Sequence, residues 1–329
     1  MSLLADALQP YLVGNLTSVS GRMELMTLAD SVTRSTAGYT LNYDSHNRCI
    51  TVDFGYPDFL MTALASDCSR LSCACFQTMI SSAADIVERD NVAWTLIKVY
   101  YSAFYGGHAI LRIFGNSCSF FDKHHTSRLL ELGPAFGLGP EFRLEPGLYE
   151  CVLNENATAM KCTRARAGAG GAHESFWEIF GRKIGTLAEE IMRGPLVRAD
   201  AQAVFAQIEE LRTILKRRAG YSWLSGVRND LQYRHQHGVW YPSAPRARER
   251  DVLNSLLDQW SRNPMNIDLR RGRGGTLGDF VSACTFIVAL CHTILVRIAE
   301  RSTAGARSFV QQGPLSFLNA RMPQTATQR

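Results

Sequence analysis

The chain has 329 residues, 46% of them hydrophobic, and a formal net charge of +5 at pH 7. This is ample for a buried core, and the length suits one large domain or two smaller ones. The nine cysteines form no regular framework, and Cys73 and Cys75 make a lone C-x-C without a second pair. We therefore expect small buried thiols in a reducing compartment, with no zinc site, no other metal and no cofactor.

No basic region followed by a long apolar run occurs at the N-terminus, so we expect a cytoplasmic protein. Residues 280–296 carry no formal charge and approach the length of a membrane span, but they include Ser282, Thr285, His292 and Thr293. A buried bundle helix is the expected form, with no membrane partner, and a membrane protein is the alternative.

Residues 1–58 predict a small α+β region. Helical spacing of leucines after Leu3 indicates one short helix, and Met23, Met26, Leu28 and Val32 indicate a second. Residues 39–43 and 49–54 alternate between apolar and polar side chains around a turn, which predicts a β-hairpin.

Residues 59–301 predict a helical bundle. An apolar stripe after Phe59 indicates one long, broken helix, and a second helix is expected between Asn91 and Phe114, with Gly115 as its stop signal. This second helix is apolar on most of its circumference, so it should be central. Its Gly106-Gly107 pair predicts the close approach of a neighbouring helix or backbone.

An insertion at about residues 117–172 interrupts this pattern. Gly-Pro pairs indicate loops, residues 148–153 and 158–163 a second hairpin, and residues 164–171 a flexible basic loop. His124 and His125 are not expected to bind a metal, because adjacent side chains point apart.

Further helices are expected at residues 173–192, 198–218, 246–260 and 278–301. A short helix after Gly220 should carry both Arg228 and His235. The polar tail at 302–329 is expected to be loosely held. The predicted fold class is therefore mainly α: a helical bundle with a small N-terminal α+β region and an inserted hairpin and loop segment.

The stretch from Gly226 to His237 holds the densest cluster of groups that could bind phosphate and move protons. Arg228 and His235 are seven positions apart, so on a helix both would lie on one face. Arginine offers a permanent positive fork for phosphate, and histidine exchanges a proton near neutral pH.

Basic charge gathers around this stretch. From Arg212 to Arg250 there are nine Lys or Arg and two acidic residues, a net of +7, which leaves −2 for the rest of the chain. Such a field favours a polyanion such as nucleic acid. A solvated basic surface, with an arginine beside a solvated histidine, is the alternative.

Two stretches resemble the HEPN family. Residues 100–111 (YYSAFYGGHAIL) are similar to the second bundle helix of HEPN domains. Arg228-Asn229, followed by His235 after a gap of six, resembles the HEPN active-site pattern of Arg, a polar residue and then His after four to six residues. The likeness covers residues 60–300 as a scaffold, and residues 1–58 and 117–172 lie outside it.

This resemblance implies a four- to five-helix bundle that pairs as a homodimer, with two Arg-His sets facing one cleft. It also implies a metal-independent endoribonuclease, of a kind that often serves as a toxin or an effector of antiviral defence. His235 would move the proton, Arg228 would hold the scissile phosphate, and Asn229 would orient either group. The products would be a 2′,3′-cyclic phosphate and a 5′-hydroxyl.

Other residues are expected near the cleft. The candidates for its lining are Tyr233, His237, Tyr101 and His108, and those for RNA contacts are Arg234, Arg246 and Arg248. The expected partners are RNA and a second copy of the chain. The N-terminal region and the insertion could sense an activator, an antitoxin or a phage-derived trigger. The alternative function is a catalytically inactive HEPN-like module that binds a nucleotide or a partner.

Overall fold

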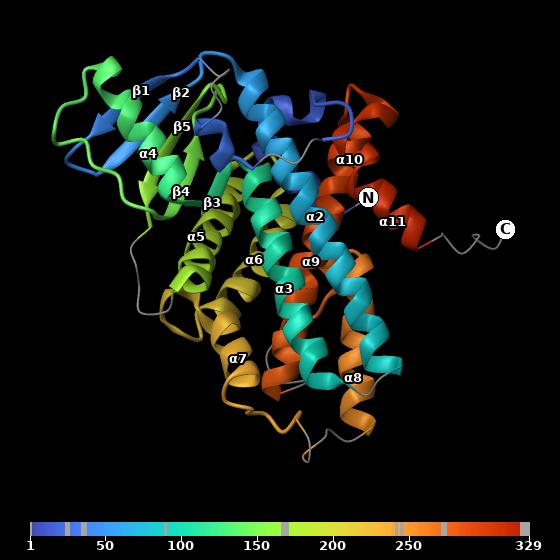
Figure 1. The fold of residues 1–329 in the computed structure, drawn as a ribbon. Coiled ribbons are helices and arrows are strands. Elements are labelled where there is room, and N and C mark those ends of the chain that lie inside the picture. Colours follow the sequence, from blue (N-terminus) through green and yellow to red (C-terminus); the bar gives the residue numbers. More distant parts are fainter. Residues whose placement is uncertain are drawn as a thin grey trace.

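A computed structural model describes residues 2–23, 27–33, 38–88, 91–165, 171–240, 243, 247–270 and 275–322. The protein is mainly helical, with a small antiparallel sheet to one side of the long helices (Figure 1). The prediction of a mainly α fold is confirmed. Both predicted hairpins are present, and the second N-terminal helix is reduced to a 3-10 turn at Ala29–Val32, with residues 24–26 outside the described part.

Three long helices form the centre of the bundle. α2 (Pro57–Glu88) and α3 (Val92–Ile113) run antiparallel, and α9 (Gly275–Arg301) packs against α3 (Figure 1). α2 contains no Gly and no Pro after Pro57, so it is continuous where the sequence pattern predicts a break. α3 ends as predicted, because Gly115 turns the chain with φ +72°.

The glycine pair in α3 allows the predicted close approach. A Cβ atom on Gly106 would lie 3.0 Å from Cys75 Sγ of α2 and 3.6 Å from Cys291 Cβ of α9. A Cβ atom on Gly107 would lie 2.8 Å from Phe176 Cζ of α5 (Gly171–Arg193). The two glycines therefore let α3 contact three helices within one turn, which places α3 at the centre of the core.

The sheet joins segments that are far apart in the sequence. Its strand order is β1-β2-β5-β4-β3, and every neighbouring pair is antiparallel. The strands are β1 (Thr40–Asp44), β2 (Cys49–Asp53), β3 (Asn116–Phe121), β4 (Gly147–Leu153) and β5 (Ala159–Arg164). Val52 of β2 lies opposite Met160 of β5. The N-terminal hairpin and the insertion therefore share one sheet.

The insertion also contains the strand β3 and the helix α4 (Lys123–Leu132), which the sequence analysis did not predict because Gly and Pro residues indicated loops there. Asp122 caps α4 by accepting the backbone N–H of His125 at 3.0 Å, and the His125 ring reaches back to Asp122 and to Asp30. His125 thus ties the helix to the N-terminal region. No group of three or more His, Cys, Asp or Glu within the described ranges is arranged for a metal ion.

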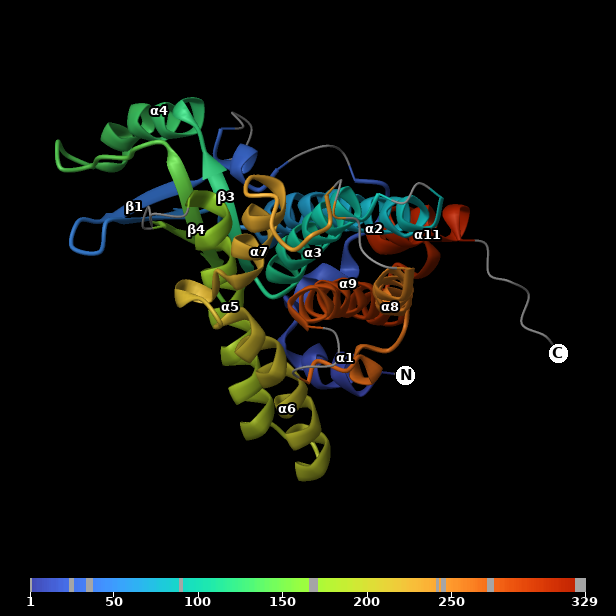
Figure 2. The ribbon, with the colours of Figure 1, turned by 90° about the horizontal axis from the view of Figure 1, so that it is seen from below.

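The remaining helices surround this centre. α5 and α6 (Arg198–Leu215) form a pair that projects away from the sheet (Figure 2). α8 (Ala247–Leu257) packs on α9, and α1 (Leu3–Leu8) packs on α6 and α9. α9 is long and apolar enough to cross a bilayer, and 78% of its most apolar stretch is buried inside the protein.

The prediction of a loosely held C-terminal tail is wrong for residues 302–322. α10 (Phe309–Gln312) and α11 (Pro314–Arg321) pack against α2. Phe309, Val310 and Leu315 are buried there, so a few apolar side chains outweigh the polar composition. Residues 323–329 lie outside the described part.

Candidate functional site

α7 (Trp223–Gln232) directs Arg228 toward α3, and only 5% of this residue is exposed. The guanidinium carbon lies 5.3 Å from the ring centre of Tyr100, 5.8 Å from that of Tyr101 and 5.9 Å from that of Tyr233. The cation is thus held among aromatic faces by cation–π contacts. The structure thereby brings two of the predicted lining residues, Tyr101 and Tyr233, to Arg228.

Arg228 has no acidic partner within the part of the chain that the structure describes. Its Nη1 donates to Gln232 Oε1 at 3.3 Å, and its buried Nε has no acceptor there. Arg112 is a useful contrast: it is 4% exposed, and its Nε donates to Asp67 Oδ2 at 2.6 Å. A buried cation without an anion is costly, so Arg228 lacks the compensation that Arg112 has.

Next to Arg228 lies a histidine that the sequence pattern does not single out. His173, near the start of α5, has its Nδ1 2.9 Å from Tyr100 Oη, and Trp177 Nε1 donates to the same oxygen at 3.1 Å. Burial, assisted by the positive charge of Arg228, lowers the pKa of His173 to about 4, so the ring is neutral at pH 7.

The tautomer of the neutral His173 ring depends on its hydrogen bond with Tyr100. Burial raises the pKa of Tyr100 well above its usual value, so its hydroxyl keeps its proton. Trp177 donates to the Tyr100 oxygen. When the Tyr100 hydroxyl donates in turn to His173 Nδ1, the ring proton lies on Nε2. In that arrangement the cluster of Arg228, His173, Tyr100 and Tyr101 places a ring N–H beside a cation, which suits an anion.

His235 does not share a helical face with Arg228, and the prediction that it does is wrong. α7 ends at Gln232, and the Gln236 N–H bonds the Asp230 carbonyl at 3.0 Å while His235 takes φ +49°. His235 thus lies three residues past the last residue of α7, in the left-handed conformation that glycine usually adopts. The chain has therefore left the helix before it reaches His235.

His235 lies in a second aromatic cluster instead. Its ring is 5.0 Å from that of Trp240, and Trp240 meets Trp94 edge-on at 5.8 Å. Trp240 Nε1 donates to the Leu231 carbonyl, which fixes this cluster beside α7. His235 is exposed, so its imidazole is open to solvent.

Three other predicted residues differ in their surroundings. Asn229 is half-buried, and its side-chain amide makes no hydrogen bond with any described residue. His237 is exposed with φ +72°. His108 stacks on Phe176 at 4.0 Å and has its Nδ1 3.3 Å from Arg112 Nη1. Burial and Arg112 hold the pKa of His108 well below its usual range, so this ring belongs to the Arg112 network.

The predicted basic field is largely paired in space. Asp230 accepts from both Arg218 and Arg234 at 2.9 Å. Arg217 pairs with Asp279 at 2.8 Å, and Arg212 pairs with Glu209. Arg234 is thus exposed but paired with Asp230. Arg246 and the side chain of Arg248 lie outside the described residues.

No family model matches the chain, and neither a curated protein nor a solved structure does. The fold and the site together define a mainly α protein with a five-stranded antiparallel sheet and a buried arginine that lies among tyrosine rings and has no acidic partner in the described chain.

Proposed function

We propose that this protein is a metal-independent endoribonuclease of the cytoplasm, with Arg228 as its phosphate-binding group. The observation that supports this most is the guanidinium itself, which is buried, has no acidic partner in the described part of the chain and has a free Nε. A phosphodiester would supply the missing negative charge through charge-assisted hydrogen bonds.

For a phosphate to reach Arg228, the Tyr233 ring has to move aside. Tyr233 is 68% exposed and follows the last residue of α7, so its rotation disturbs little packing. An exposed cation–π contact contributes about 0.5–1 kcal/mol. A hydrogen bond to a charged group contributes about 1.5–3 kcal/mol. The exchange of ring for phosphate is therefore favourable.

Proton transfer and phosphate binding would be divided between two histidines. His173 presents Nε2–H beside Arg228, where it can donate to a phosphate oxygen. The exposed His235 would take the proton from the attacking 2′-oxygen and return one to the leaving 5′-oxygen. The new 2′-O–P bond replaces the P–O5′ bond, so the products are a 2′,3′-cyclic phosphate and a 5′-hydroxyl.

RNA and a second copy of the chain are the partners that we propose. The resemblance to HEPN domains implies a two-fold pair, and such a pair would bring two sites together at one cleft. Light scattering on the purified protein should give the mass of a dimer.

One observation favours the alternative, an anion-binding module without cleavage. His235 lies beyond the end of α7 and contacts Trp240, whereas Arg228 and His173 form a cluster of their own. In that case the cluster would hold a nucleotide phosphate, and no group would move the proton.

Labelled RNA incubated with the protein in EDTA tests both functions. Arg228→Met removes the cation, and His235→Gly removes the imidazole while suiting the left-handed backbone at that position. Arg301→Met, at the exposed last residue of α9, removes an equal charge as a control. We expect metal-free cleavage by the wild type and the control, with cyclic phosphate ends, and none by the other two variants.

Three results would separate the functions. Cleavage that persists in both Arg228→Met and His235→Gly would contradict the site. RNA or nucleotide binding without cleavage, lost in Arg228→Met alone, would establish the module. A single 2′-deoxy substitution at the cleaved position must block the reaction, because it removes the nucleophile.

A further inference from the structure

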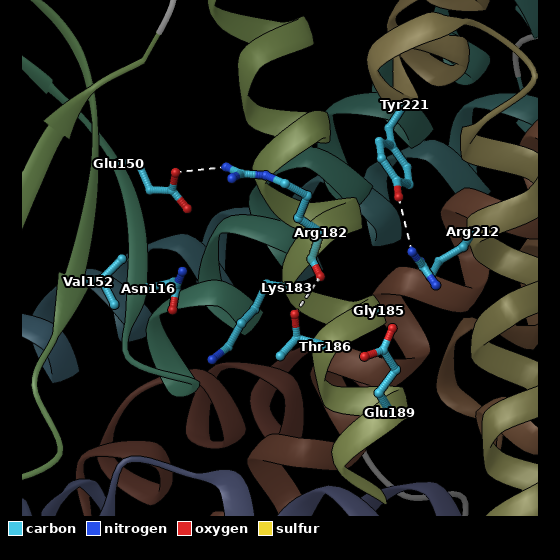
Figure 3. Close-up of a pocket in the computed structure, with 10 residues that line it drawn as sticks. All are labelled: Asn116, Glu150, Val152, Arg182, Lys183, Gly185, Thr186, Glu189, Arg212 and Tyr221. Carbon is cyan, nitrogen blue, oxygen red and sulfur yellow. Dashed lines mark hydrogen bonds and ion pairs between the residues drawn. The ribbon is translucent and has the colours of Figure 1, made fainter. Parts of the chain in front are cut away.

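A cleft of about 480 Å³ lies between the strands β3 and β4, at one edge of the sheet, and the helices α5 and α6 (Figure 3). β3 and β4 form one wall, α5 forms the floor, and Arg212 of α6 and Tyr221 close the far side. None of the Arg228 cluster lines it. Its size is that of a pocket for a small metabolite.

Two glycines on α5 shape this cleft. A Cβ atom at Gly181 would overlap the Tyr221 ring, and one at Gly185 would overlap the Arg212 guanidinium. These positions are one helical turn apart. Glycine inside a helix costs about 1 kcal/mol relative to alanine. The glycines therefore let Tyr221 and Arg212 lie flat on α5, with Arg212 Nη2 donating to Tyr221 Oη at 3.1 Å.

Two polar groups in the cleft lack a partner. Lys183 is half-buried and forms no hydrogen bond or ion pair with any described residue. Burial lowers the pKa of Lys183, and the negative charge of Glu190 opposes this. Asn116 is 8% exposed, and its side-chain amide also makes no hydrogen bond within the described ranges. The Asn116 amide and the Lys183 ammonium are therefore both available to a ligand in the cleft.

The other two cations of the cleft each have an acidic partner, although the buried Nε of Arg212 has no acceptor among the described residues. Arg182 donates to Glu150 at 2.7 Å (Figure 3). Arg212 pairs with Glu209. Glu150 and Glu189 also line the cleft. Two carboxylates in the lining repel a polyanion such as RNA, but they accept hydrogen bonds from hydroxyl groups. The single unpaired lysine, Lys183, can neutralise one anionic group of a ligand.

We infer that this cleft binds a small metabolite with a single phosphate or carboxylate group. Lys183 and Asn116 hold the anionic group, and Glu150 and Glu189 accept hydrogen bonds from hydroxyls elsewhere on the molecule. The site is separate from the Arg228 cluster and does not depend on ribonuclease activity.

Calorimetric titration of the full chain carrying Arg228→Met tests this site, because that change removes the other anion-binding group. The probes are ribose 5-phosphate, inorganic phosphate and succinate. We expect saturable binding of at least one, and Lys183→Met in the same background should weaken it by roughly tenfold or more. Lys123→Met, at an exposed position in the first turn of α4, should leave it unchanged.

The unliganded Lys183→Met protein should melt at the same temperature as its parent or higher, because the ammonium that it loses is unpaired. Binding of ribose 5-phosphate but not succinate identifies a phosphate ligand, and the reverse identifies a carboxylate. The inference is overturned if no probe binds at millimolar concentration, or if Lys183→Met binds as tightly as its parent. RNA cleavage is not measured, so this result and that of the ribonuclease test are independent.

Discussion

Arg228→Met should leave the protein nearly as stable as the wild type, whereas Arg112→Met should not. Both guanidiniums are buried, at 5% and 4% exposure, and Met keeps much of the aliphatic volume. The difference lies in their partners, since Arg112 bonds the buried Asp67 and Arg228 bonds no carboxylate in the described chain.

The magnitudes follow from these partners. Removing one member of a buried ion pair costs about 3–5 kcal/mol. Arg70 still contacts Asp67 at 2.6 Å, so Arg112→Met should fall at the lower end, about 3 kcal/mol. Arg228→Met loses cation–π contacts worth about 0.5–2 kcal/mol each. It also recovers a desolvation penalty of several kcal/mol, so its net effect should lie within about 1 kcal/mol of zero.

Urea unfolding, followed by tryptophan fluorescence and by circular dichroism, measures both changes. The two probes must give coincident transitions before the free energies are compared. A loss for Arg228→Met as large as that for Arg112→Met would show that Arg228 is a structural residue. The proposed phosphate-binding role would then be refuted.

Three further changes have defined outcomes. Gly107→Ala should destabilise the protein by about 1–3 kcal/mol in thermal unfolding, despite the better helix propensity of alanine. The reason is that the new Cβ would lie 2.8 Å from the fully buried Phe176. An increase in stability would mean that α5 can shift. His173 binds a proton at about pH 4 when folded and near pH 6.5 when unfolded, so its contribution to stability is complete above pH 6.5 and is lost as the pH falls toward 4. His173→Gln should flatten that part of the stability profile, and an unchanged slope would contradict the burial of the neutral ring. Tyr233→Ala should tighten phosphate binding at Arg228 about two- to fivefold, since it removes a competing cation–π contact; weaker binding in a titration would show that the ring assists the ligand.

Local patterns were sufficient to predict most helices but not the end of α7. α3 could be predicted because its signals come from neighbouring residues. Its apolar side chains recur at helical spacing, and Gly115 follows directly as a stop. α7 ends at Gln232, and the left-handed residue that follows, His235, is not a glycine, so no local signal marks the end of the helix. A histidine in that conformation is uncommon, although less so than most residues.

Long-range contacts explain the other differences. His173 joins the Arg228 cluster through Tyr100 and Trp177, and no motif connects these positions along the chain. The pairing of β2 with β5 likewise depends on register between distant segments. The polar composition of the C-terminal segment led to the wrong prediction of a loosely held tail. The segment has few apolar residues, but two of them, Phe309 and Val310, are fully buried.

The pairing of β2 with β5 has a consequence during protein synthesis. β2 ends at Asp53 and its partner begins at Ala159. At roughly 5–20 residues per second, the ribosome needs on the order of 5 to 20 seconds to make the intervening chain. During that interval one edge of the N-terminal hairpin has unpaired backbone groups, which could pair with another nascent chain. The sheet can therefore close only after α2 and α3 have emerged, and a chaperone that shields this edge should raise the yield of folded protein.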